Sequence, residues 1–113
     1  MTSVAFTEVA QKTLSVLADH LDQEISDYAS IDLAQDSITV EFDDRRVLLI
    51  TLHNTLGQLW VSSPISGGTH FLYDAQKGIW IATKDQSLDL LYVLEQDLIQ
   101  LTANPSIQLR PRI

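Results

Sequence analysis

The chain opens with apolar residues at helical spacing. Between residues 4 and 28 they recur at steps of three, four and seven, which is typical of the buried stripe of an amphipathic helix. The stripe consists of Phe6, Ala10, Leu14, Leu17, Leu21 and Tyr28. The opposite side is polar and becomes acidic toward its C-terminal end, at Asp19 and Asp22. We therefore expect a helix over 4–28 that packs on one side and exposes acids on the other.

After this helix the period changes to two. Apolar and polar residues alternate in short segments, a pattern typical of half-buried strands. The segments cover residues 31–33, 38–42, 47–52, 59–61, 71–73 and 79–81. The stretches between them are short and rich in Asp, Asn, Gly and other turn formers, which favours hairpins. Consecutive hairpins predict an antiparallel meander.

A second helical pattern follows the strands. Its leucines are Leu88, Leu91, Leu94, Leu98 and Leu101. Ser87 is a suitable N-cap, and Asn104-Pro105 should end the helix. Beyond it, we expect the tail to pack back on the core through Ile107 and Leu109.

Helix, meander and helix together predict an α+β fold. Two helices that bracket an antiparallel sheet can both bury their apolar stripes only against a sheet face. We therefore expect a two-layer α/β sandwich with five to six strands, covered on one face by the N- and C-terminal helices. At 113 residues, residues 1–113 should form a single domain.

Composition excludes several classes of protein. A hydrophobic content of 45% and a charged content of 19% are those of an ordinary globular domain. The absence of cysteine excludes disulfides, thiolate metal sites and cysteine nucleophiles. No apolar run approaches the roughly 20 residues of a membrane span, and no signal peptide is visible.

Negative charge is concentrated at the start of the chain. Residues 1–44 hold ten of the fifteen acids but only one of the seven bases, so their net charge is −9 within a total of −8. The remaining residues carry a net charge of +1. Nucleic acids and anionic membranes are poor partners for such a surface, whereas cations or a basic protein suit it.

One predicted strand has a tryptophan on its otherwise polar side. If Leu59 and Val61 face the helices, Trp60 faces solvent. The outward set also includes Asp32, Thr39, Glu41, Thr51, His53, Gln58 and Ser62. Trp60 is then either a core-edge residue half-covered by the loop at 64–69, or a docking anchor, since tryptophan is enriched at interface hot spots.

The acidic residues also allow two interpretations. Carboxylates suit a hard cation such as iron, and Asp19 and Asp22 share a helical edge that Asp27 and Asp32 could approach across the turn into the first strand. The acids could equally form a solvated face without a ligand. The sequence has no compact His-rich or two-His-one-carboxylate motif and no convincing Ser–His–Asp set. A tight catalytic iron centre or nucleophilic catalysis is therefore not expected.

One segment resembles a known family. The sequence "QLWVSSPISGGTHF" at 58–71, followed by "YDAQKGIW" at 73–80, resembles the frataxins, as do the acidic first helix and the order of elements over about residues 4–102. The resemblance implies a weak iron-binding regulator of iron–sulfur cluster assembly that docks on a cysteine desulfurase and its scaffold protein. It implies iron as the only cofactor, with no organic one.

Positions carry over from the family pattern as follows. The acidic ridge, our name for the implied iron-binding acids, consists of Glu8, Asp19, Asp22, Glu24, Asp27 and Asp32. The implied partner-binding residues are Thr51, His53, Gln58, Trp60, Ser62 and His70. Gln58 and Trp60 match the family directly. Thr51 and His53 depart from it, because many relatives have Asn and Gln in the corresponding positions. His70 stands where mitochondrial relatives often have Arg. The side chains of the implied docking face therefore differ in part from those of the family.

An alternative function remains open. Surface carboxylates could oxidise and store iron, and ferroxidase activity has been attributed to some family members, although no di-iron ligand set is recognisable here. We expect a protein that is not an enzyme, with no nucleic-acid or membrane partner. We also expect a monomer, with an iron-dependent oligomer as the alternative. Met1 directly before the helix favours the bacterial cytoplasm over the mitochondrial matrix.

Overall fold

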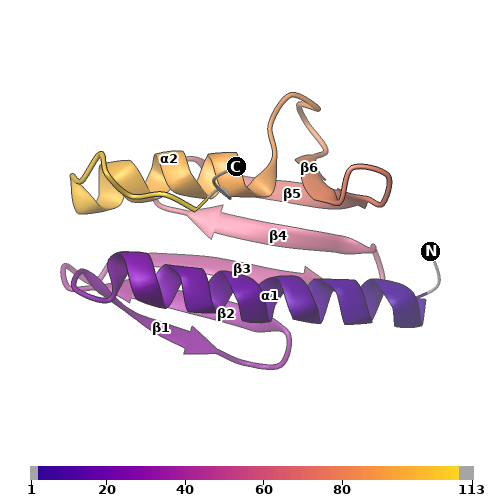
Figure 1. Ribbon diagram of the computed structural model, residues 1–113, viewed down its shortest axis with the longest axis horizontal. Helices are drawn as coiled ribbons and strands as arrows, with labels where there is room; N and C mark the ends of the chain where they lie inside the picture. The colour runs from indigo at the N-terminus through magenta and orange to yellow at the C-terminus, as the bar shows by residue number, and fades with distance from the viewer. Residues whose placement is uncertain (1–2, 110–113) are drawn as a thin grey trace.

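Two helices and six strands make up the fold (Figure 1). The structure is a computed structural model that describes residues 3–109. In chain order the elements are α1 (Ser3–Ile25), β1 (Ala29–Leu33), β2 (Ser37–Phe42), β3 (Val47–His53), β4 (Gln58–Ser63), β5 (Gly67–Asp74), β6 (Ile79–Ala82) and α2 (Leu90–Thr102). No helix within residues 3–109 is long and apolar enough to cross a membrane.

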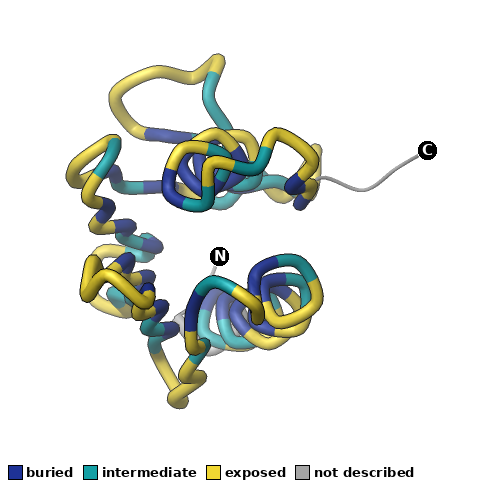
Figure 2. Tube along the Cα trace, turned by 90° about the vertical axis from the view of Figure 1, so that its left-hand side faces the viewer, coloured by how far each residue is buried: buried dark blue, intermediate teal, exposed yellow. Residues whose placement is uncertain are grey.

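The strands form one antiparallel sheet in sequence order, β1 to β6. Figure 2 shows both helices on the same side of this sheet, so its other face is open to solvent. The predicted meander and two-layer α+β sandwich are confirmed.

Alternation within each strand decides which residues enter the core. In β3, Leu48, Ile50 and Leu52 are buried beneath the helices. The intervening residues of β3 are exposed or half-buried on the open face. The buried stripe of α1 covers the sheet, and its residues Leu14 and Leu21 are almost fully buried. The sequence pattern therefore predicts correctly which face of each central strand meets the helices.

The first helix ends earlier than predicted. It stops at Ile25, and Tyr28 belongs to the turn that follows rather than to the helical stripe. The carbonyl of Tyr28 accepts a hydrogen bond from the backbone N–H of Asp43, 3.2 Å away, next to the β1–β2 ladder. The chain must become extended here to pair β1 with β2, which ends the helix although Tyr28 keeps the apolar spacing.

The second helix begins later than predicted. Ser87 is not its N-cap, because the Ser87 hydroxyl donates to Asp85 Oδ1 at 2.6 Å and the Ser87 N–H donates to the same atom at 3.0 Å. Asp89 is the N-cap instead, with an extended backbone and a carboxylate that accepts the Tyr92 N–H at 2.7 Å. The helix ends at Thr102, just before the predicted stop.

The tail crosses between the two helices. Ile107 and Leu109 are buried, as the sequence predicts. The backbone N–H of Gln108 donates to Glu24 Oε1 of α1 at 2.8 Å, and that of Leu109 donates to Glu95 Oε1 of α2 at 3.0 Å. The tail thus joins the last turn of α1 to the middle of α2, although these helices lie at opposite ends of the sequence.

Candidate functional site

Three aromatic rings stack on the open face of the sheet. Trp60 lies in β4, directly opposite His70 of β5 and diagonal to His53 of β3. The His53 and Trp60 ring centroids are 3.7 Å apart with an interplanar angle of 24°, and those of Trp60 and His70 are 3.9 Å apart at 5°. Because β4 lies between β3 and β5, the two imidazoles cover opposite faces of the indole. We call these three residues the His–Trp–His stack.

Gln58 fixes the orientation of the indole. The Trp60 Nε1–H donates to Gln58 Oε1 at 2.7 Å, and the two residues are neighbours on the same face of β4. All three rings are half-buried rather than freely exposed. A partner that approaches this face therefore meets the edge of a held indole and two imidazoles, not a mobile tryptophan.

The loop after β4 is hydrogen-bonded toward the helical layer. The core-edge interpretation placed the 64–69 segment over Trp60, but the ring contacts of Trp60 are with the two histidines. Ser66 of this loop donates instead to the buried carboxylate of Asp97 in α2, at 2.6 Å. The loop is thus tied toward the helical layer, and the indole remains on the open face.

The surroundings of the stack are mixed polar and apolar. Thr51 pairs with Trp60 across the β3–β4 ladder and is half-buried, whereas Ser62 is exposed. Leu49 and Leu72 present large apolar side chains on the same face, 36% and 47% exposed. Exposed apolar residues around a held aromatic group are the composition of a protein-docking surface.

The acidic ridge is spread out rather than gathered into one site. Asp19 and Asp22 are exposed on α1, Asp27 is exposed in the following turn, and Asp32 is exposed on β1. Glu8 is exposed eleven residues before Asp19 on the same helix, about 16 Å along its axis. Within residues 3–109, no three His, Cys, Asp or Glu side chains are grouped so that they would hold a metal ion.

Glu24 has a structural role that the sequence did not reveal. It is half-buried, and its carboxylate accepts the Gln108 N–H of the tail. Its contact lies 84 residues away in the sequence, so no local pattern could indicate it. A cation at Glu24 would compete with this hydrogen bond for the same oxygen.

Two carboxyl groups outside the ridge have shifted acidity. The pKa of Asp44 lies below its usual value, mainly because the backbone N–H of Arg46 donates to it, with the Arg46 guanidinium 2.6 Å away adding to the effect. The pKa of Asp85 is lowered chiefly by the hydrogen bond from the Ser87 hydroxyl. Both groups stabilise turns and lie away from the stack.

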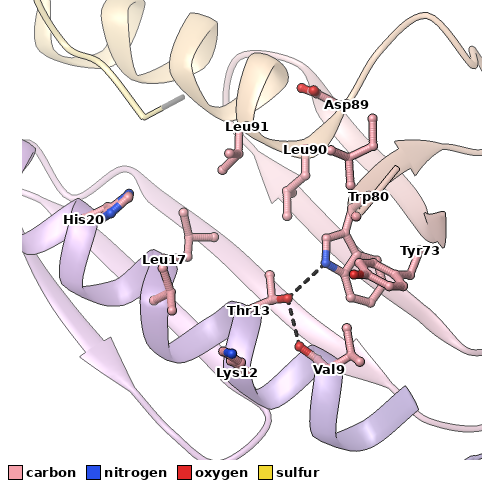
Figure 3. Close-up of a pocket in the computed structure, with 13 residues that line it drawn as sticks. Val9, Lys12, Thr13, Leu17, His20, Tyr73, Trp80, Asp89, Leu90 and Leu91 are labelled. Carbon is pink, nitrogen blue, oxygen red and sulfur yellow. Dashed lines mark hydrogen bonds between the residues drawn. The ribbon is translucent and has the colours of Figure 1, made fainter. Parts of the chain in front are cut away.

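A cavity of about 470 Å³ lies between the helices, on the opposite side of the sheet from the stack (Figure 3). Its lining is mainly apolar and includes Leu17, Leu90 and Trp80. The Trp80 indole N–H donates to Thr13 Oγ1 at 3.0 Å, and the Thr13 hydroxyl donates to the Val9 carbonyl at 2.8 Å. The polar atoms of these residues are thus engaged with one another.

Comparison with known proteins decides the family. A family model described as a frataxin-like domain matches residues 1–104. The chain belongs to the frataxin family. Among frataxin relatives, the mitochondrial frataxin homologue of Schizosaccharomyces pombe is 27% identical over 109 residues, covering 93% of this chain and 68% of that protein.

Bacterial frataxins match as well. The iron–sulfur cluster assembly protein CyaY of Pseudomonas entomophila is 30% identical over 88 residues, 78% of each chain. That of Thioalkalivibrio sulfidiphilus is 30% identical over 83 residues, covering 72% of this chain and 76% of that protein.

Solved frataxin structures share the fold. A frataxin from Psychromonas ingrahamii superposes with a TM-score of 0.80 at 19% identity and covers 91% of this chain and 93% of its own. A trimeric frataxin from Saccharomyces cerevisiae, complexed with ferrous iron, has a TM-score of 0.70 at 22% identity, covering 85% and 87%.

The family pattern matched Gln58 and Trp60 directly but did not predict the contacts that hold their side chains. Strand alternation predicted that His53 lies beside Trp60 on the open face. His70 was expected at the docking face only as a departure from the family. The stacking of the His70 ring on the indole depends on the β4–β5 register, which places His70 directly opposite Trp60.

Proposed function

We propose that this protein is an iron-binding regulator of iron–sulfur cluster assembly that docks on a cysteine desulfurase and its scaffold protein. The observation that carries the proposal is its membership of a family whose bacterial relatives are named iron–sulfur cluster assembly proteins. The chain matches relatives from bacteria and a mitochondrial one alike. For its location we propose the bacterial cytoplasm, with the mitochondrial matrix as the alternative.

The docking surface in this proposal is the open sheet face centred on the His–Trp–His stack. Its other members are Thr51, Gln58 and Ser62. The rings are already held in place, so little side-chain freedom is lost when a partner binds, and such pre-organisation favours affinity. The acidic ridge provides a second contact for a basic surface of the same assembly.

Trp60→Arg tests the docking surface. We expect it to abolish capture by an immobilised desulfurase–scaffold complex while the melting temperature falls by only a few degrees, since Trp60 lies outside the core. Tyr92→Arg is the matched control, because Tyr92 is an exposed aromatic residue of α2 in the helical layer, where the same substitution should leave capture intact. Equal capture of Trp60→Arg and the parent protein would refute the docking proposal.

We further propose that iron binds weakly at the acidic ridge. Exposed carboxylates suit a hard cation, but scattered ligands leave the ion much of its water and give low affinity. A frataxin complexed with ferrous iron motivates this part of the proposal. The main ligands are Asp19, Asp22, Asp27 and Asp32, with Glu24 and Glu8 as lesser ones, since Glu24 already holds the tail and Glu8 lies far along α1.

Titration with Fe²⁺ under anaerobic conditions, followed by NMR, tests the iron proposal. Resonances of the four aspartates should broaden first. Broadening centred on His53 and His70 would instead move the metal site to the open sheet face. The alternative of iron oxidation and storage predicts oxygen consumption and large assemblies when oxygen is admitted, whereas a monomeric regulator needs neither.

A further inference from the structure

The His–Trp–His stack places two titratable rings on either side of the central docking residue. Histidine changes its charge between about pH 5 and 8. An imidazolium over the face of an indole is stabilised by a cation–π interaction. Since each imidazole lies against its own face of Trp60, both can take up a proton while the stack persists. The charge presented beside Trp60 then rises from zero to +2.

The open face is divided by charge. On its β1 and β2 side it carries Asp32 and Glu41. On β3 to β6 the outward residues near the stack are uncharged apart from the histidines, with Asp74 at the end of β5, where Oδ1 accepts the backbone N–H groups of Gln76 and Lys77.

The turns that border this half carry acids and bases in nearly equal numbers. The acids of these turns are Asp36, Asp43, Asp44, Asp74 and Asp85, and the bases are Arg45, Arg46, Lys77 and Lys84. Arg46 is paired with Asp44. The charges that border β3 to β6 therefore nearly balance, although the whole chain carries −8, and two imidazolium charges at the stack would make their sum positive.

We propose that the stack is the docking site for an acidic, partly apolar segment of the protein partner, and that protonation of His53 and His70 strengthens this docking. Charge complementarity assigns carboxylates opposite the imidazoles. The exposed Leu49 and Leu72 beside the stack supply apolar contacts. The inference rests on the proposed function, whose basic partner surface would instead face the acidic ridge.

A binding experiment at two pH values tests this inference. The affinity of the parent protein for the desulfurase–scaffold complex is measured at about pH 6 and pH 8, alongside His53→Gln/His70→Gln. Glutamine keeps hydrogen-bonding capacity but cannot gain charge. We expect the parent protein to bind about tenfold more tightly at the lower pH, as for one or two charge pairs at a partly desolvated interface, and the double variant to show less than about a twofold difference.

Two controls isolate the histidines. His20→Gln, on α1 in the helical layer, should keep the pH dependence of the parent protein. Binding of all variants at about 50 and 300 mM salt should show a salt dependence for the parent protein at the lower pH that the double variant loses.

A measurement without any partner separates this inference from the proposed function. Imidazolium quenching of a stacked indole should make tryptophan fluorescence fall on acidification in the parent protein, and this component should vanish in Trp60→Phe. Fluorescence that is independent of pH would refute the stack as the titrating unit. If the complex binds at no pH, the proposed function fails instead.

Other results would overturn the acidic-partner assignment. Binding that does not change with pH, or that changes equally in the double variant, would contradict it. Concentration-dependent dimerisation of the parent protein alone, lost in Trp60→Arg and seen by sedimentation, would identify a second copy of the chain as the occupant.

Discussion

At the scale of single residues, the position of the Trp60 ring depends on one neighbour. The indole could rotate about its side-chain torsions, but the 2.7 Å hydrogen bond from Nε1 to Gln58 Oε1 selects one orientation. Both imidazoles stack on the ring in that orientation. Gln58 therefore holds the proposed docking residue in place.

Gln58→Leu tests this role. The variant keeps the size of the side chain but removes the acceptor, so we expect faster hydrogen exchange of the Trp60 indole N–H and weaker binding of the partner. Stability should fall by only about 1 kcal/mol, because a half-exposed hydrogen bond contributes little net free energy. Gln58→Glu retains an acceptor and should keep the slow exchange. An unchanged exchange rate in Gln58→Leu would show that stacking alone orients the ring.

At the scale of the elements, the local sequence pattern predicted which helices and strands exist, and which side of each is buried. It predicted less well where each helix begins and ends. The alternation in β3 and β4 identified the buried face because each inward residue meets the helices. The helix ends could not be predicted in this way. Tyr28 keeps helical spacing but lies in the turn before the β1–β2 ladder, and Ser87 resembles an N-cap but bonds to Asp85. The Glu24 contact with the tail is likewise non-local.

The C-terminal end of α2 allows a test of backbone strain. Ala103 terminates the helix in the left-handed region, with φ of 55°. A Cβ in this conformation costs roughly 1 kcal/mol, which glycine avoids. We expect Ala103→Gly to raise the free energy of unfolding, measured in urea, by about 0.5 kcal/mol, which is the relieved strain less the greater conformational entropy of glycine in the unfolded chain.

Ala75→Gly is the matched control for this substitution. Ala75 is exposed in the β5–β6 turn and is not among the residues of positive φ. Glycine there gains no relief of strain and still increases the entropy of the unfolded chain, so it should destabilise by about 0.5 kcal/mol. A loss of stability in both variants would show that the Ala103 conformation is not strained.

At the scale of the whole molecule, the distribution of acidic residues lowers the stability of the fold. The acids of α1 increase toward its C-terminus, where no basic residue occupies the last turn. Acids at that end oppose the helix dipole, and neighbouring like charges repel. Within residues 3–109 the structure shows a salt bridge between Arg46 and Asp44, and neither residue belongs to the acidic ridge. Apart from Glu24, which holds the tail, the fold thus tolerates acids that its own packing does not require, as expected if a cation or a basic partner binds them.

Asp19→Asn/Asp22→Asn should therefore make the protein more stable. Asparagine and aspartate have similar helix propensities, so the substitution mainly removes charge. We expect a gain of about 0.5 to 1 kcal/mol at low salt, from relieved repulsion and a less opposed dipole. The gain should shrink as salt screens the charges. Divalent cations should stabilise the parent protein, by binding the folded state, more than they stabilise the double variant.

Glu8→Gln provides a control of opposite sign on the same helix. Glu8 lies in the N-terminal half of α1 and precedes Lys12 by four residues, so its charge should be attracted to that of Lys12 across one turn. Its removal should lower the melting temperature slightly. If the aspartate double variant is instead less stable than the parent protein at every ionic strength, Asp19 and Asp22 make bonds that the fold needs. The acidic ridge would then serve the structure of α1 rather than bind a cation, and the proposal of iron binding would lose its physical basis.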